Sequence, residues 1–324
     1  MPKAVLVTHP GGPEVFEFKE LAVAKLKPGE VLIRHTAIGL NFLDIYHRTG
    51  LYPLPAFPAV IGVEACGVVE EISKGVNGLK LGDRVAYCTA PPGAYCEYRP
   101  VNQDYLVKVP KSMTDEQAAA CMVKGLTAYY LLHKTCKVKR GDFILVHAAA
   151  GGVGQLLCQW GKHLGAKVIG TVGSEEKIKA VTKIGCANVV NYRQENFAKK
   201  IMEITNGKGV KIAYDSVGKD TIIGSLESLA DFGMLVSFGQ SSGKIPDFDI
   251  SLLAKKSLFM TRPSLFTYMK SREQLEEGAE ALFSSIAKGI TKINIARTYQ
   301  LKEAATAHRD LESRKIIGSA VLLP

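Results

Sequence analysis

A regular alternation of apolar strands and helical segments over the middle of the chain constrains the fold more than any other feature. Six short apolar runs are predicted as strands, at residues 143–147, 167–172, 188–192, 211–215, 234–238 and 258–261. Between the first two, the apolar residues follow the helical period and stop at Gly165, a typical helix-ending glycine. Strands that alternate with helices predict a parallel sheet covered on both faces, which is a doubly wound α/β architecture.

The turn after the first predicted strand has the glycine pattern of a phosphate-binding site. The strand runs into His147, three alanines and the run Gly151, Gly152, Val153, Gly154. Gly151 lets the backbone approach a pyrophosphate, and the start of the following helix supplies N–H donors. Ala149 stands where the first glycine of G-x-G-x-x-G is usual, but the strand, turn and helix are in the required order. We therefore expect a dinucleotide site rather than a bare tight turn.

The end of the second predicted strand favours NADPH over NADH. NAD sites commonly place Asp or Glu there to bind the ribose 2′-hydroxyl, whereas residues 171–174 contain no carboxylate. Gly173 and Ser174 would form a cradle for a 2′-phosphate, with Lys177 as the cation and Tyr192 as a stacking or hydrogen-bonding partner. The alternative for Lys177 is an ordinary solvated lysine on a helix.

The two ends of the chain differ from the middle. Short strands between Gly and Pro residues are predicted at 3–7, 30–37, 65–72, 84–88 and 95–99. After residue 262 we expect a helix that begins with a capping box of Ser271 and Gln274, a helix around 304–311 and a strand at 319–323. These segments predict a discontinuous β-rich domain, residues 1–122 and 262–324, with a dinucleotide-binding domain of residues 123–261 inserted.

Composition excludes several classes of protein. The 324 residues are 47% hydrophobic and 22% charged, which is ordinary for a globular chain of about two domains. The seven cysteines include no Cys-x-x-Cys pair, so neither a disulfide framework nor a zinc ribbon is expected, and a cytoplasmic location is favoured. The longest uncharged stretch, residues 143–161, contains glutamines and glycines that are costly in lipid, so no membrane insertion is expected.

The net charge of +10 is compatible with anionic partners such as nucleotides, nucleic acid or membrane surfaces. The nearest cationic cluster, within residues 134–140, is short and has no interleaved aromatic residues. Nucleic acid is therefore not the expected partner.

Residues 62–69 and 82–85 resemble the medium-chain dehydrogenase/reductase superfamily, which implies a GroES-like β-rich domain beside a Rossmann sheet. Zinc alcohol dehydrogenases of that superfamily carry Gly-His-Glu where this chain has Gly62, Val63 and Glu64. Residues 39–44 lack their cysteine ligand, and residues 122–125 lack the third one. We therefore expect no metal. Oxidation of an alcohol needs a Lewis acid, whereas a quinone or enone accepts hydride without one, so a reductase is favoured.

A closer resemblance covers essentially the whole chain. It is carried by residues 41–46, 50–53, 124–128, 147–154, 191–193, 215–218, 237–239, 261–264 and 312–314. These segments are similar to bacterial NADPH:quinone oxidoreductases of the zeta-crystallin type. The resemblance implies hydride transfer from NADPH to a quinone in an interdomain cleft, without metal, and a homodimer formed through an edge strand of the Rossmann sheet, here residues 258–261.

The resemblance also implies roles for individual residues. Asn41, Tyr46 and Tyr52 would act at the quinone and stabilise the developing oxyanion. The cofactor would be contacted by Asn41, Phe42, Asp44, Tyr46, Lys124, Thr127, Gly151, Gly152, Val153, Gly173, Ser174, Lys177, Tyr192, Ser216, Phe238, Gly239, Ser241, Ser242 and Arg314. Each has a structural alternative: the tyrosines could be packing residues, Asn41 a turn residue and Arg314 a cation at a helix terminus.

Two other functions stay open at this point. Zinc-free relatives with the same scaffold and cofactor reduce the double bond of enones or enals. A different class is a protein that binds NADPH or RNA and has little catalytic role. The physiological acceptor, the number of electrons per step and the proton donor are not decided by the sequence.

Overall fold

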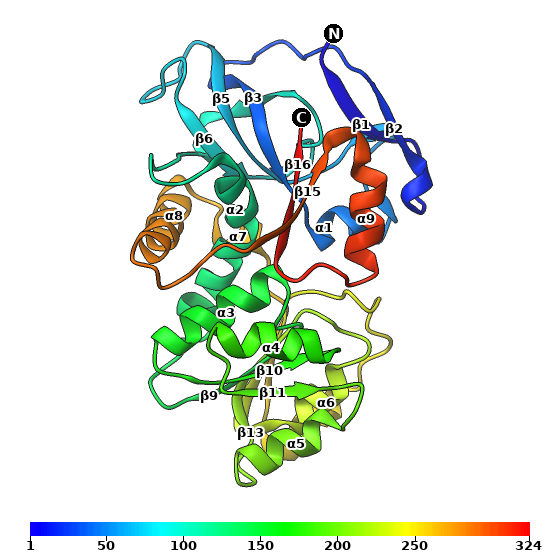
Figure 1. The fold of residues 1–324 in the computed structure, drawn as a ribbon, viewed down its shortest axis with the longest axis vertical. Helices are drawn as coiled ribbons and strands as arrows, with labels where there is room; N and C mark the ends of the chain where they lie inside the picture. The colour runs from blue at the N-terminus through cyan, green and yellow to red at the C-terminus, as the bar shows by residue number, and fades with distance from the viewer. The chain divides into compact units, whose positions relative to one another are not determined.

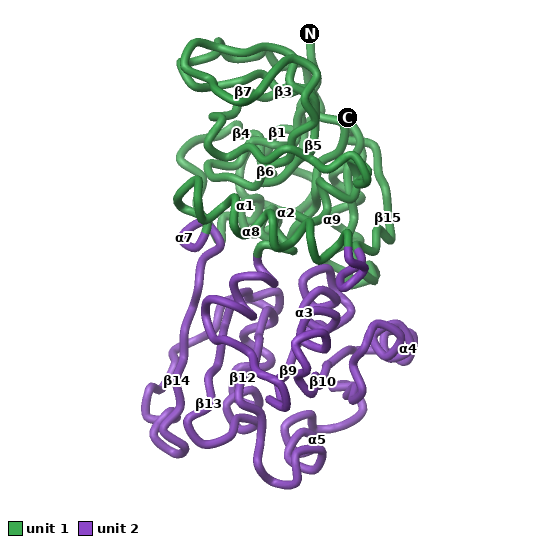
Figure 2. Tube along the Cα trace, turned by 90° about the vertical axis from the view of Figure 1, so that its left-hand side faces the viewer, with its two compact units in different colours: residues 1–126, 269–287, 293–324 green, residues 127–268, 288–292 purple.

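The computed structural model describes residues 1–324 and divides into two compact units (Figure 2). Unit 1 consists of Met1–Leu126, Met269–Ala287 and Ile293–Pro324. Unit 2 consists of Thr127–Tyr268 and Lys288–Lys292. The main borders, after Leu126 and Tyr268, lie a few residues beyond those predicted from the sequence.

Unit 2 is built on a six-stranded parallel sheet with the order β11-β10-β9-β12-β13-β14. Its strands are β9 (Phe143–Val146), β10 (Lys167–Val172), β11 (Asn188–Asn191), β12 (Val210–Asp215), β13 (Leu229–Ser237) and β14 (Phe259–Thr261). The strand order reverses at β9, the first strand of this sheet along the chain, which is the switch point at which doubly wound sheets bind their ligands. The predicted doubly wound parallel sheet is confirmed.

Helices cover this sheet because the strands are apolar throughout. Unit 2 contains α3 (Gly152–His163), α4 (Glu175–Lys183), α5 (Phe197–Ile204), α6 (Ile222–Glu227), α7 (Leu265–Tyr268), a 3-10 helix (Ile250–Lys256) and a π-helical turn (Leu131–Thr135). Helix α3 packs on β9 and β10, and α4 packs on β10 and β11 (Figure 1). Leu145, Ile169 and Leu235 are fully buried in the core that results.

Unit 1 is rich in β-structure. A seven-stranded sheet has the order β15-β16-β3-β5-β6-β8, with β7 paired to β3, and a three-stranded sheet has the order β2-β1-β4. The strands are β1 (Lys3–Val7), β2 (Phe16–Glu20), β3 (Glu30–Gly39), β4 (Ala59–Val60), β5 (Glu64–Ile72), β6 (Arg84–Cys88), β7 (Tyr98–Asn102), β8 (Leu106–Lys108), β15 (Ile295–Gln300) and β16 (Ser319–Leu323).

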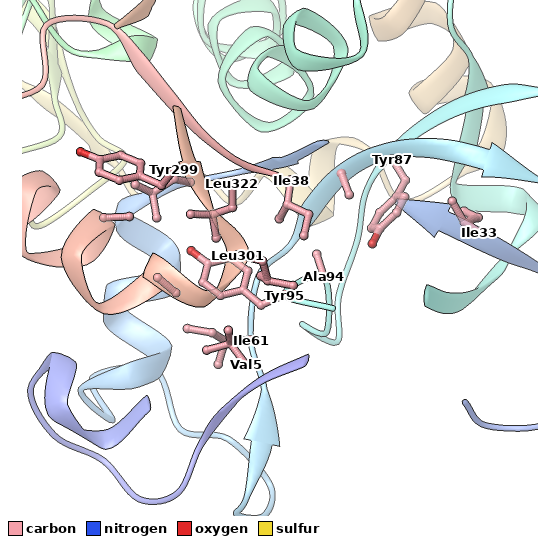
Figure 3. Close-up of a cluster of buried hydrophobic side chains, with 14 of the residues drawn as sticks. Val5, Ile33, Ile38, Ile61, Tyr87, Ala94, Tyr95, Tyr299, Leu301 and Leu322 are labelled. Atoms are coloured by element: carbon pink, nitrogen blue, oxygen red, sulfur yellow. The ribbon is translucent and has the colours of Figure 1, made fainter. Parts of the chain in front are cut away.

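The helices of unit 1 are α1 (Phe42–Arg48), most of α2 (Asp115–Tyr130), α8 (Arg272–Ala287), α9 (Ala304–Glu312) and 3-10 turns at Pro13–Val15, Gln103–Tyr105 and Leu301–Glu303. The core between the strands contains whole aromatic rings: Tyr87 and Tyr95 are fully buried (Figure 3). Tyr95 lies beside Leu301 and Ile61, so its hydroxyl must find partners inside the unit.

Several local predictions differ from the structure. The strand predicted at 95–99 lies at Tyr98–Asn102, because Tyr95 instead donates its backbone N–H to Ile61 and leads into the strand. β2 and β15 were not predicted, since both are mostly exposed and have no apolar run. The capping box before α8 is confirmed: Ser271 N–H donates to Gln274 Oε1 at 3.1 Å, and Gln274 N–H donates to Ser271 Oγ at 3.3 Å. None of the helices has both the length and the apolar character needed to span a bilayer.

Candidate active site

The predicted phosphate turn joins β9 to α3 in unit 2. Gly151 is the N-cap of α3, and the first N–H groups of the helix have no acceptor within it, as at every helix start. A Cβ on Gly154 would collide with the carbonyl oxygen of Ala148. The close packing of helix on strand that the sequence predicted for Gly154 is therefore observed, and the turn presents backbone donors and a positive helix end to an anion.

The departure of this turn from G-x-G-x-x-G has a structural explanation. Ala149 is fully buried, and its N–H donates to the carbonyl of Thr171 at 3.1 Å. A Cβ on Gly170 of β10 would lie 2.9 Å from the Ala149 methyl. The missing side chain at Gly170 thus makes room for the extra methyl at Ala149. The positive φ of the turn, 48°, falls on Ala148, a conformation that favours glycine.

The predicted cradle for a 2′-phosphate lies at the end of β10. A Cβ on Gly173 would lie 2.6 Å from the hydroxyl of Tyr192, so the missing side chain gives the tyrosine room to approach. Ser174 is the N-cap of α4, and its hydroxyl accepts the N–H of Lys177 at 3.4 Å. The structure brings these four residues together in unit 2.

One residue predicted at the 2′-phosphate lies in the other unit, and one residue beside the cradle was not predicted. Arg314 lies in unit 1, just after α9, with a φ of 58°. Glu175, a carboxylate that the sequence reasoning did not consider, follows Ser174 and accepts the amide of Asn191 at 3.4 Å. That contact turns one of its oxygens toward β11.

The ends of β12 and β13 bring together the residues predicted at the ribose and nicotinamide. Ser241 N–H donates to the Ser216 carbonyl at 3.1 Å, and a Cβ on Gly239 would lie 2.8 Å from the same oxygen. Ser242 N–H donates to the Val217 carbonyl at 2.9 Å. Phe238 precedes Gly239 directly, so the predicted set Ser216, Phe238, Gly239, Ser241 and Ser242 forms one loop pair at the carboxyl edge of the sheet.

Arg262 and Asp215 support this loop pair, although neither was predicted to have a functional role. The guanidinium of Arg262 donates to the Ser237 hydroxyl at 2.9 Å and to the Gly239 carbonyl at 3.1 Å. The fully buried Asp215 accepts the N–H groups of Val217 and Gly218 at 2.8 and 2.9 Å. Through these bonds both residues hold the loop pair in place.

In unit 1, three donors converge on the carboxylate of Glu64. Glu64 is fully buried, and it accepts the Lys124 ammonium at 2.8 Å, the Asn41 amide at 2.7 Å and the backbone N–H of Val123 at 2.6 Å. A Cβ on Gly39 would collide with this carboxylate, so the cluster needs a glycine there. Asn41 and Lys124, both predicted as site residues, are thus held by the same acid.

A second buried chain of polar groups begins one helical turn away, at Asp44. Its Oδ2 accepts the N–H of Asn41 at 2.8 Å and the hydroxyl of Tyr95 at 3.1 Å. The tyrosine hydroxyl also meets His308 Nε2 at 3.0 Å, and His308 Nδ1 lies 3.1 Å from an Arg48 nitrogen. Arg48 continues the chain as an ion pair with Glu312, at 2.6 Å.

The arginine fixes the direction of these hydrogen bonds. A guanidinium only donates, so His308 Nδ1 accepts and its proton sits on Nε2. His308 then donates to Tyr95, which donates to Asp44. Burial and the charge of Arg48 hold the pKa of His308 well below its usual range, which keeps the ring neutral. Burial raises the pKa of Asp44 to about 7, and its Oδ1 has no hydrogen-bond partner.

The two predicted tyrosines lie side by side. The ring centroids of Tyr46 and Tyr52 are 5.2 Å apart in an edge-to-face arrangement, and Phe42 stands 6.4 Å from Tyr46. His47, which the sequence reasoning missed, lies 6.2 Å from Tyr52. Burial lowers the pKa of His47 to about 4, and its Nδ1 has no hydrogen-bond partner. The ring is therefore neutral in this aromatic group.

The residues of this chain do not fit a zinc ion. No group of three or more His, Cys, Asp or Glu side chains is close enough to hold a metal. Val63 stands where zinc alcohol dehydrogenases have a histidine ligand, and the carboxylate of Glu64 is already paired with the ammonium of Lys124. Burial raises the pKa of Cys66 to about 12, whereas metal binding requires the thiolate.

Comparison with known proteins agrees with this geometry. Residues 27–111 match the family described as alcohol dehydrogenase GroES-like domain, and residues 152–285 match the family described as zinc-binding dehydrogenase. A GroES-like unit and a Rossmann sheet in one chain define the medium-chain dehydrogenases/reductases, so the protein is an oxidoreductase of this class.

Individual relatives narrow the class. Quinone oxidoreductase 1 of Escherichia coli is 46% identical over 317 residues, which are 97% of each chain. A crystal structure of Escherichia coli quinone oxidoreductase complexed with NADPH has a TM-score of 0.97 and 45% identity, and the match covers 99% of this chain and 100% of that one. A 2-haloacrylate reductase of a Burkholderia species is 45% identical over 100% of this chain and 99% of its own length. The chain belongs to the quinone oxidoreductase family.

Proposed function

We propose that this enzyme reduces quinones with NADPH. The observation that carries the proposal is the anion-binding turn at the start of α3, next to a strand end whose residues 171–174 have no carboxylate to repel a 2′-phosphate. The Escherichia coli relative in complex with NADPH supports this choice of cofactor. When bound, NADPH supplies a hydride ion, which carries two electrons.

The proposed cofactor contacts follow from the placement of the groups in unit 2. The backbone of Gly151, Gly152 and Val153 would hold the pyrophosphate. Gly173, Ser174, Lys177 and Tyr192 would surround the 2′-phosphate, and the resemblance adds Arg314. The loop pair at Ser216, Phe238, Gly239, Ser241 and Ser242 would border the ribose and nicotinamide, with Thr127 and Lys124 also in contact with the cofactor.

Unit 1 would supply the acceptor side. We propose that residues 1–122 and 262–324 act as the substrate domain and residues 123–261 as the cofactor domain. Asn41, Tyr46 and Tyr52 would bind the quinone oxygen, and Phe42 and Asp44 would lie at the nicotinamide end. The fixed amide of Asn41 and the paired tyrosine rings support this, because catalysis here depends on orientation and on hydrogen bonds to the developing oxyanion.

The test is NADPH oxidation by the purified chain with 1,4-benzoquinone as acceptor, followed by the loss of NADPH absorbance. We expect turnover that saturates in both substrates and that is much slower with NADH. Absence of quinone-dependent NADPH oxidation, in a protein that still binds NADPH, would overturn the proposal.

A second candidate function is reduction of an activated carbon–carbon double bond. It is favoured by the 2-haloacrylate reductase at 45% identity. The same assay with 2-chloroacrylate and 1-octen-3-one in place of the quinone separates the two. Faster turnover of either alkene, with little on quinones, would replace quinone reduction by alkene reduction.

We also propose a homodimer formed through β14, and a cytoplasmic location. β14 is an edge strand, and Phe259 on it is 56% exposed. Phe232 and Ile250, at 71% and 76% exposed, add further apolar surface to unit 2. An edge of this kind is usually covered in the native state. A monomer by light scattering at micromolar concentration would contradict the dimer.

A further inference from the structure

Lys124 and Glu64 form a buried ion pair inside unit 1. The side chain of Lys124 is 7% exposed and that of Glu64 is 0% exposed, and their charged atoms lie 2.8 Å apart. The other titratable groups that interact electrostatically with the pair are Asp44, Cys88, Tyr95 and Cys121. Burial raises the pKa of both thiols above their usual range, so neither supplies a second negative charge.

The ammonium of Lys124 has donors left over. It carries three N–H groups, and Glu64 is its one hydrogen-bond acceptor in the chain. Buried donors without an acceptor are costly, so a site that keeps them is completed by an ordered water, an ion or a ligand. A carbonyl oxygen or an anion would satisfy the two remaining donors of Lys124.

Glu64 holds this ammonium in one position. It also binds the Asn41 amide and the Val123 backbone, which leaves the carboxylate little freedom to move. Glu64 therefore fixes both the positive charge of Lys124 and the side-chain amide of Asn41. Such preorganised groups stabilise charge that develops during a reaction without having to reorient.

We propose that Lys124, anchored by Glu64, is the electrophile of this enzyme and donates a hydrogen bond to the carbonyl oxygen of the acceptor. This inference rests on the proposed quinone reductase function and adds a catalytic residue to it. Hydride brings both electrons to the acceptor, a carbonyl π pair moves onto the oxygen, and the resulting oxyanion takes one proton from water. Lys124 keeps its protons and balances the negative charge.

This role replaces the cofactor contact proposed for Lys124 above, and the two roles differ in what they predict. A lysine that only binds NADPH would change the affinity for NADPH. A lysine that stabilises the oxyanion would change kcat and the binding of anionic acceptor analogues, and it would leave NADPH affinity nearly unchanged. The two roles therefore separate in a titration and a rate measurement.

The experiment compares wild type with K124M, with K124M/E64Q and with the control K108M. K124M leaves Glu64 buried without its cation, which destabilises the fold, and the double variant removes both charges. Lys108 pairs with Asp83 on the surface of unit 1 and serves as the matched lysine. For each variant, NADPH affinity is measured by fluorescence, and kcat is measured with 1,4-benzoquinone.

The second readout does not depend on activity. 4-Nitrophenol absorbs differently as phenol and as phenolate, and it mimics the reduced acceptor. Bound to the wild-type complex with NADP⁺, it should ionise at a lower pH than in solution, and this shift should disappear in K124M/E64Q.

We expect kcat to fall roughly 100-fold in K124M and K124M/E64Q, with NADPH affinity within about threefold of wild type and K108M unchanged. A kcat within threefold of wild type, a loss explained by NADPH affinity, or nitrophenol that binds the wild type without a shift in ionisation would overturn the role of Lys124. A wild type that reduces no quinone would instead refute the function on which it rests.

Discussion

The two units handle charge in opposite ways. In unit 2, the turn after β9 prepares for a pyrophosphate with backbone alone: it exposes helix N–H groups and keeps side chains out of the way. Unit 1 buries ionisable side chains, and it holds them with one another: Lys124 with Glu64, and Arg48 with His308 and Glu312. A site made of backbone tolerates few changes of shape, whereas a site made of buried charges tolerates few changes of charge. Substitutions that alter one property at a time test this difference.

The largest effect is expected for R48M in unit 1. Arg48 is 1% exposed. Besides its ion pair with Glu312, it donates hydrogen bonds to His308 Nδ1 and to the carbonyl of Gly11. Its loss leaves buried acceptors without donors and should lower the free energy of unfolding by about 4 kcal/mol. Denaturant unfolding of wild type and R48M measures this loss in the free energy of unfolding.

The matched control is R34M. Arg34 also meets a carboxylate at 2.6 Å, that of Glu70, but both side chains are well exposed, so the cost should stay below about 1 kcal/mol. Equal losses in R34M and R48M would show that burial does not set the value of these pairs.

The next effect is a change in pH dependence from D44N. Because burial raises the pKa of Asp44 to about 7, the folded state keeps a proton that the unfolded state, with an ordinary value of 3.8, releases. Asp44 therefore lowers stability as pH rises from about 4 to about 7. Asparagine stays neutral, so D44N should gain about 4 kcal/mol relative to wild type between pH 4 and pH 8.

Unfolding curves of both proteins at the two pH values measure this gain. A constant difference between D44N and wild type across the range would mean that Asp44 is ionised throughout in the folded state.

In unit 2, G154A changes the shape of the turn before α3 without changing any charge. An added Cβ would meet the Ala148 carbonyl and would lie 2.7 Å from the Ala149 Cα, so α3 must move away from the strand. We expect a loss of about 2 kcal/mol in stability and a weaker affinity for NADPH, measured by unfolding and by fluorescence titration. In G151A the new Cβ meets only the Ala148 oxygen, at 3.3 Å, so its stability should change less.

The smallest effects come from the two alanines of the same turn, with opposite signs. A148G relieves a positive φ of 48° and should stabilise the protein by about 0.5 kcal/mol. A149G removes a buried methyl that fills the space beside Gly170 and should cost about 1 kcal/mol. Thermal unfolding would measure both. The same sign for both would refute the explanation of the altered glycine motif.

The contrast between the backbone turn of unit 2 and the buried side-chain clusters of unit 1 also explains which features could be predicted from the sequence. The turn at residues 147–154, the capping box at Ser271 and the terminal strand are local patterns, in which neighbouring residues determine one another. The sequence therefore predicted the six-stranded parallel sheet, and also the proximity of Gly173 to Tyr192 and of Ser174 to Lys177.

The buried clusters of unit 1 could not be read in this way. Lys124 is 60 residues from Glu64, and His308 is 260 residues from Arg48. A pattern within one segment of the sequence cannot predict a contact with a residue so far away along the chain. From the sequence, Glu64 stands out only as the neighbour of Val63, where a zinc ligand is missing. His47 was missed because a lone histidine on a helix carries no signal until its neighbours are known.

The most direct test of the account is the ratio of kcat/KM for NADPH to that for NADH, with 1,4-benzoquinone as acceptor and with a variant of the cradle, K177M, alongside. We predict a ratio above about 10 in wild type, which falls toward 1 in K177M because the cation at the 2′-phosphate is lost. A wild-type ratio near 1, or a strong preference for NADPH that K177M leaves intact, would contradict the assignment of this end of β10 to the 2′-phosphate.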